Sequence, residues 1–129
     1  MILPAADELL APVMAIDGFR LACLIDGSTG MVLTSLENRD GPAPATAAPT
    51  AAAGAADVIN VLTLLNGRLA TGENLEDVMV TFSDSFFMVR PVRQDQEPQI
   101  LLLVIADRQR TNLAMAYRSI RDFCASFTS

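Results

Sequence analysis

Histidine, lysine and tryptophan are absent from the 129 residues, and the chain has only two cysteines and one tyrosine. Without histidine it cannot form Ser-His-Asp or Cys-His nucleophilic sites, or metal sites with histidine ligands. Without lysine it cannot form a Schiff base or the lysine-containing phosphate loop of many nucleotide-binding proteins. A Gly-x-Gly-x-x-Gly dinucleotide fingerprint is also missing. These absences favour a protein that binds other proteins over an enzyme.

Carboxylates and thiols are the remaining routes to catalysis or metal binding. Glu76 and Asp77 are adjacent on an expected strand, where successive side chains point to opposite faces, so we interpret them as solvated charges. The turn Asp26–Gly30 has too few carboxylates for a calcium loop and is interpreted as a hairpin turn. Cys23 and Cys124 lie far apart among apolar neighbours, which favours two reduced core thiols over a disulfide or redox pair. We therefore expect no catalytic residue, no metal and no cofactor.

The charge of the chain bears on its partners and its location. The net charge is −6, and all nine basic residues are scattered arginines. Such a surface repels nucleic acid and anionic membranes, because both are negatively charged. No continuous apolar run reaches the roughly 20 residues that span a bilayer, and residues 1–8 lack a basic region followed by an apolar stretch. We expect a cytoplasmic protein with no nucleic-acid partner and no direct membrane insertion.

The apolar pattern predicts the order helix, two strands, helix, three strands, helix within a single domain, residues 1–129. The first helix, Asp7 to Ile16, is expected to be short or kinked because Pro12 lies inside it. A last helix is expected after a cap at Thr111 or Asn112. The strands are expected at Phe19–Ile25, Met31–Thr34, Leu75–Phe82, Phe86–Arg90 and Ile100–Ala106. Five strands with helices on both faces make a three-layer α/β sandwich.

Residues 37–50 differ in composition from both flanks. They are rich in proline and small residues that cannot pack a core, so we expect an exposed, flexible loop within the domain. It is not interpreted as a domain boundary, because neither flank is large enough to fold alone. Thr50 is expected to cap the helix that follows.

That second helix, expected from Ala51 to about Ala70, has an apolar arc wider than a sheet contact requires. At about 100° per residue, apolar side chains cover more than half of its circumference, whereas a helix on a sheet needs a stripe of somewhat over 100°. The excess apolar surface predicts a contact with another subunit. The stripe consists of Val58, Val61, Leu62, Leu65 and Leu69, with Ile59 and Leu64 on its flanks.

Phe19–Asp26, the glycine turn after it and Met31–Leu33 resemble the first hairpin of the roadblock/dynein light chain family. The likeness extends from about Asp7 to Phe127 and rests on element order and apolar pattern. Its later parts are the apolar second helix, Leu75–Val80, Phe86–Val92, Ile100–Ala106, the link Asp107–Asn112 and the final helix.

The resemblance implies an α+β fold of the profilin/longin type. Its five-stranded antiparallel sheet would carry the second helix on one face and the first and third helices on the other. It also implies a homodimer in which third strands pair edge to edge and second helices pack together. The further partner would be a small Ras-like GTPase in a bacterial signalling or polarity system, with this chain as a non-catalytic regulator or scaffold.

For the dimer or partner interface we expect the second-helix residues Val58, Val61, Leu62, Leu65 and Leu69 and the third-strand residues Asp77, Met79 and Thr81. The alternative is a longin-, profilin- or PAS-like sensor module that binds a peptide or small ligand. A closed cavity of ligand size would favour this alternative.

Overall fold

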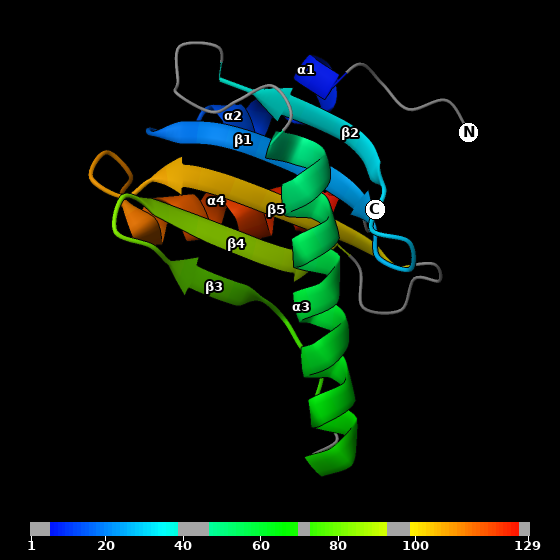
Figure 1. Cartoon of the computed structure of the whole chain (residues 1–129). Helices are drawn as coiled ribbons and strands as arrows, with labels where there is room; N and C mark the ends of the chain where they lie inside the picture. The colour runs from blue at the N-terminus through cyan, green and yellow to red at the C-terminus, as the bar shows by residue number, and fades with distance from the viewer. Residues whose placement is uncertain (1–5, 39–46, 70–72, 93–98, 127–129) are drawn as a thin grey trace.

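The structure is a computed structural model that describes residues 6–38, 47–69, 73–92 and 99–126. It has one sheet with helices on both faces, as Figure 1 shows. The elements are α1 (Ala6–Leu9), α2 (Ala11–Met14), β1 (Phe19–Asp26), β2 (Val32–Glu37), α3 (Ala47–Leu69), β3 (Val78–Thr81), β4 (Ser85–Pro91), β5 (Ile100–Asp107) and α4 (Leu113–Ser126). The predicted element order and the three-layer α/β arrangement are confirmed.

The sheet has the strand order β2-β1-β5-β4-β3, and each neighbouring pair is antiparallel. β5 lies at the centre of this order, between β1 and β4, and the side chains of β1 and β5 are buried on both faces. Leu102 and Val104 of β5 face α4, while Leu101 and Leu103 face α3. This arrangement leaves β2 and β3 as the two edges of the sheet.

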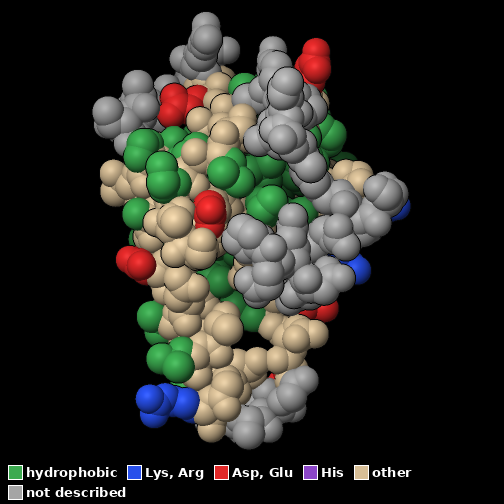
Figure 2. Space-filling model, turned by 90° about the vertical axis from the view of Figure 1, so that its right-hand side faces the viewer, with side chains coloured by type: hydrophobic (Ala, Val, Ile, Leu, Met, Phe, Trp, Pro, Cys, Tyr) green, Lys and Arg blue, Asp and Glu red, His purple; other side chains and the backbone are tan. Residues whose placement is uncertain are grey.

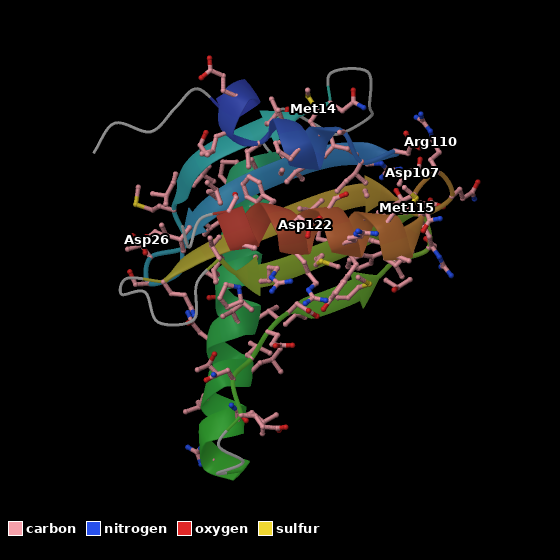
Figure 3. All side chains as sticks on the ribbon, turned by 180° about the vertical axis from the view of Figure 1, so that it is seen from behind. Met14, Asp26, Asp107, Arg110, Met115 and Asp122 are labelled. Carbon is pink, nitrogen blue, oxygen red and sulfur yellow. The ribbon has the colours of Figure 1, made fainter. Side chains whose placement is uncertain are left out.

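Two apolar cores lie on the two faces of the sheet. On one face, α2 and α4 pack over β1, β4 and β5, with Leu10, Val13, Ile120 and Phe123 among the buried side chains. Figure 3 shows α4 lying across this face, with Asp122 near the middle of the helix. On the other face, α3 packs on β1, β2 and β5. Its buried side chains are Ala48, Ala52, Ala55, Ala56 and Ile59.

The first helix is interrupted close to Pro12, as predicted. The segment forms two four-residue helices, α1 and α2, separated at Leu10. Pro12 falls in the first turn of α2, where its missing N–H removes no helical hydrogen bond. The predicted cap of the last helix is also present, because the Met115 N–H donates to the Asn112 side-chain oxygen at 3.2 Å.

The predicted loop over residues 37–50 needs correction at both ends. Glu37 is the last residue of β2, and α3 begins at Ala47, so Thr50 lies inside the helix and does not cap it. Pro49 lies in the first turn of α3, where proline is compatible with helix. The composition did not locate the start of the helix, because proline and alanine occur both in loops and in a first helical turn. Residues 39–46 lie outside the described part of the chain.

The expectation that no segment is long enough to cross a membrane also needs correction. Ala48–Arg68 of α3 is long and apolar enough by length and composition, with 21 residues and a mean hydropathy of 1.4. Polar residues such as Asn60 and Asn66 interrupt the segment, so a search for continuous apolar runs does not find it. The first half of the helix packs on its own sheet, so length and composition are weak evidence for a membrane span.

Gly18 lies just before β1 and contacts the turn that follows β5. Its φ is +84°, a region that side-chain-bearing residues rarely adopt. The Gly18 carbonyl accepts a hydrogen bond from the Asp107 N–H at 2.7 Å, and the Thr111 hydroxyl donates to the Asp17 carbonyl at 2.8 Å. A Cβ on Gly18 would lie 2.5 Å from the Thr111 Oγ1, so the two turns can approach only because residue 18 is glycine.

We expect Gly18→Ala to lower the free energy of unfolding by about 2 kcal/mol or more, because it combines the left-handed backbone with a steric clash. Gly67→Ala is the matched control: a Cβ there meets nothing within 4 Å. In an exposed helical position alanine should raise stability by about 0.4–1 kcal/mol. Chemical denaturation at one fixed protein concentration measures both. Equal stability of the two variants would contradict this account of Gly18.

Candidate protein-interaction surface

The second half of α3 extends past the edge of the sheet, beyond β3 (Figure 1). Ile59 is the last buried residue of the helix for which a side chain is described. The helix turns its alanines to the sheet and leaves its larger apolar side chains uncovered. Val58 is 40% exposed, Val61 63%, Leu64 61% and Leu65 49%, while Leu62 is partly buried.

The end of the sheet next to this part of α3 also carries uncovered apolar side chains. Val78, Val80 and Phe82 alternate along β3 on the face that carries α3, and Val80 and Phe82 are exposed. The Phe82 ring packs edge-on against Phe87 at a centroid distance of 4.9 Å. We call the exposed or partly buried set Val58, Val61, Leu62, Leu64, Leu65, Val80 and Phe82 the α3/β3 surface. Figure 2 shows hydrophobic side chains along the side of the molecule formed by α3.

An open groove of about 840 Å³ separates the second half of α3 from the segment that leads into β3. The same region is hollowed in Figure 2. The groove mixes leucines with carboxylates, so it is apolar on its α3 side and acidic on the other. The Asn66 side-chain amide bridges it by donating to the Glu73 carbonyl. The lining residues are Leu62, Leu65, Asn66, Glu73, Asn74, Leu75, Glu76, Asp77 and Tyr117.

Tyr117 ties the start of β3 to α4 on the opposite face of the sheet. Its hydroxyl donates to the Asp77 carboxylate at 2.6 Å. This hydrogen bond, with smaller contributions from burial and from the Asp77 charge, raises the pKa of Tyr117 above its usual value. Met79 packs into the α4-side core. Asp77 and Met79 are therefore already engaged within the chain, although neither is fully buried.

The predicted interface residues lie on two faces of the molecule. The helix residues Val58, Val61, Leu62 and Leu65 lie on the α3/β3 surface, and the side chain of Leu69 lies outside the described part of the chain. On the strand, Asp77 and Met79 turn to the α4 face, and Thr81 is exposed on that same face by alternation. The sequence interpretation did not select Leu64, Val80 or Phe82. The alternation of β3 contained the signal, but which face α3 leaves uncovered depends on where the helix lies.

The thiols and carboxylates of the described residues show no reactive grouping. Cys23 is buried on the α3 side and Cys124 on the α4 side, so the sheet separates them and both are free. Burial, with the charge of Glu37, raises the pKa of Cys23 to about 12, and burial raises that of Cys124. Such thiols are protonated and poor nucleophiles. Within the described ranges, no three His, Cys, Asp or Glu side chains are grouped so that they could hold a metal ion.

A small-ligand sensor needs a closed cavity of ligand size, and the hollow that the described residues form under α4 is too small. An apolar hollow there, lined by residues such as Met88, Val104 and Ile120, measures about 20 Å³. That volume is about the room one water requires. A drug-sized ligand needs several hundred Å³. The hollow under α4 is therefore too small for an enclosed ligand site.

No family model and no curated protein matches the chain, whereas solved structures do. A Roadblock/LC7 domain from Streptomyces avermitilis has a TM-score of 0.78 at 18% identity, covering 95% of this chain and 94% of that one. MglB with a tetrameric arrangement has a TM-score of 0.80 at 20% identity, covering 98% and 90%. The gliding protein MglB from Thermus thermophilus has a TM-score of 0.78 at 20% identity, covering 96% and 89%. The likeness covers nearly the whole of each chain and confirms the fold that the sequence pattern indicated: this chain has the roadblock/LC7 fold.

Proposed function

We propose that this chain is a non-catalytic regulator or scaffold that forms a homodimer and binds a small Ras-like GTPase. We place it in the cytoplasm of a bacterium, in a signalling or polarity system. The observation that carries the proposal is the exposed α3/β3 surface beside a free sheet edge. The fold supports it, because similar structures include a gliding protein, MglB, and an MglB with a tetrameric arrangement.

A homodimer would cover the parts of this surface that a single copy leaves bare. If two β3 edges paired, the unpaired backbone groups of each edge would gain partners. The overhanging half of each α3 would then extend over the other copy's sheet, towards its Val80 and Phe82. Leu62 lies only about 60° from Ile59 around the helix, so it would point to that second sheet.

The GTPase is proposed to bind the outer side of α3. Val61 and Leu64 lie roughly opposite Ile59 on the helix, about 160° and 140° away. They point away from any sheet that the helix covers, and each is more than 60% exposed. Exposed apolar side chains on a rigid helix are typical anchors of protein interfaces. In the dimer they would be present twice.

The first test is the solution mass by light scattering, which we expect to be twice the 13.8 kDa of the chain. Leu65→Glu should yield monomer or aggregate, because it places a charge in the apolar contact. Met115→Glu is the control, since Met115 is 68% exposed on α4, on the far face of the sheet (Figure 3). A monomeric wild type, or an unchanged dimer for Leu65→Glu, would contradict the dimer assignment.

The second test is binding of a Ras-like GTPase from the same genome, loaded with GDP or with a non-hydrolysable GTP analogue, by calorimetry. We expect the wild type to bind one nucleotide state in preference. Leu64→Glu should weaken binding by about tenfold or more while the mass stays that of the dimer, because an anchor is lost and a charge is buried. Met115→Glu should bind as the wild type does. An intact dimer that binds neither nucleotide state would refute the GTPase assignment and leave the dimer standing.

A further inference from the structure

We propose that Arg90 and Arg121, together with Tyr117, form a binding site for a carboxylate group on the α4 face of the sheet. This face is opposite the one that carries α3, so the inference depends neither on the proposed dimer nor on the proposed GTPase. It follows from a buried guanidinium whose donors lack acceptors, from a second guanidinium close by and from the balance of charges around the two.

The side chain of Arg90 contains buried polar atoms without a hydrogen-bond partner. Met88, two residues earlier on β4, packs in the α4-side core, so by alternation Arg90 points to the same face. The Arg90 Nε and Nη1 atoms are buried, and neither has a partner in the described part of the chain. A buried charged donor without an acceptor is costly, because it has lost its hydration and gained no bond in return. An anion that contacts this guanidinium would remove that cost.

The Arg90 guanidinium lies beneath the part of α4 between Tyr117 and Cys124. The hydrogen bond to Asp77 raises the pKa of Tyr117, and burial raises the pKa of Cys124, while the positive charge of Arg90 opposes both shifts. Because electrostatic effects weaken with distance, Arg90 must lie near both side chains. The guanidinium is therefore held between β4 and α4.

A second guanidinium and an open hollow lie beside the same part of α4, which Figure 3 shows with Asp122 labelled. The Arg121 Cζ is 5.9 Å from the centroid of the Tyr117 ring. The hollow measures about 460 Å³, and Tyr117, Arg118, Arg121, Asp122 and Ala125 line it. Arg121 is exposed, and an exposed cation–π contact is weak, so its side chain can turn outwards. A carboxylate that enters from the hollow can then contact both guanidinium groups.

The charges around the hollow favour an anion with a single negative charge. Arg90, Arg118 and Arg121 are positive and Asp77 and Asp122 negative, which leaves an excess of one positive charge. A carboxylate balances that excess, and its two oxygens match the geometry of a guanidinium. A phosphate dianion would carry more charge past the two aspartates and would be repelled more strongly. The site therefore favours a carboxylate over a phosphate.

The fluorescence of Tyr117 tests the site directly. Tyr117 is the only tyrosine and the chain has no tryptophan, so this signal comes from the site itself. At pH 7 and constant ionic strength, replacing chloride by acetate should change the emission with saturation in the millimolar range, as expected for a ligand of few atoms. Collisional quenching by acetate gives only a linear change. The midpoint of thermal unfolding should rise in acetate as well, because a ligand that binds the folded state stabilises it.

Three variants locate the binding group. Arg90→Gln should raise the half-saturating acetate concentration by about tenfold or more, because it removes the buried partner of the carboxylate. Arg121→Gln, at an exposed position, should raise it by about twofold to fivefold. Arg110→Gln is the matched control for charge: Arg110 is exposed beyond the start of α4 (Figure 3) and should leave the value within about twofold. If Arg90→Gln fails to fold, Arg121→Gln still tests the site.

Each result supports or overturns the inference. Saturation in the wild type that weakens in Arg90→Gln and Arg121→Gln, with Arg110→Gln unchanged, supports it. A linear response in the wild type, or equal half-saturation in all four proteins, overturns it. Tighter binding of inorganic phosphate than of acetate overturns the choice of a carboxylate.

A second titration distinguishes the two sources of the carboxylate, a free small acid and an acidic side chain of another protein. The probe is the α-amide of N-acetylglutamate, whose only carboxylate is that of the side chain. Tighter binding than acetate supports the site with a glutamate side chain as its ligand. Weaker binding than acetate supports the site with a free small acid as its ligand. No saturable binding of either probe overturns the inference and leaves the proposed dimer and GTPase binding untouched.

Discussion

The contact between the alanine side of α3 and the sheet determines most of what is distinctive in this structure. Ala48, Ala52, Ala55 and Ala56 let the helix backbone lie close to β1, β2 and β5, and Ile59 ends the contact. Because small residues face the sheet, the larger valines and leucines of the helix must point elsewhere. Val58, Val61, Leu64 and Leu65 are among the side chains that the sheet leaves exposed. The helix therefore acts both as one side of the core and as an exposed surface.

The edge strand β3 and the second half of α3 each lack a neighbour on one side among the described residues. α3 continues past β3, so its second half has no sheet beneath it (Figure 1). Among the described residues, β3 has a partner strand on one side only, and its α3-facing side chains Val80 and Phe82 are exposed. On the opposite face the same strand is well anchored, through Met79 in the core and through the hydrogen bond between Asp77 and Tyr117. A strand held on one face and bare on the other is well suited to pairing without unfolding.

The two thiols of the described residues are buried and unreactive. The two thiols are buried on opposite sides of the sheet, and their raised pKa keeps them protonated. An open groove in which leucines and carboxylates are mixed lies beside α3, while the hollow beneath α4 has room for about one water. The groove is open to solvent and the hollow beneath α4 is small, so neither is a closed cavity of ligand size.

The sequence by itself determined the order of the elements, a short or kinked first helix around Pro12 and a cap of the last helix at Thr111 or Asn112, because these depend on local periodicity and local hydrogen bonds. It also indicated that the second helix carries more apolar surface than one sheet can cover. It did not determine that α3 begins at Ala47, because alanine and proline fit both a loop and a first helical turn. Only the tertiary structure decided which side of α3 meets the sheet and which face of β3 stays bare. Those outcomes depend on how closely a helix of small residues approaches the strands and on where it passes the sheet edge, and neither is encoded in the spacing of residues along one element.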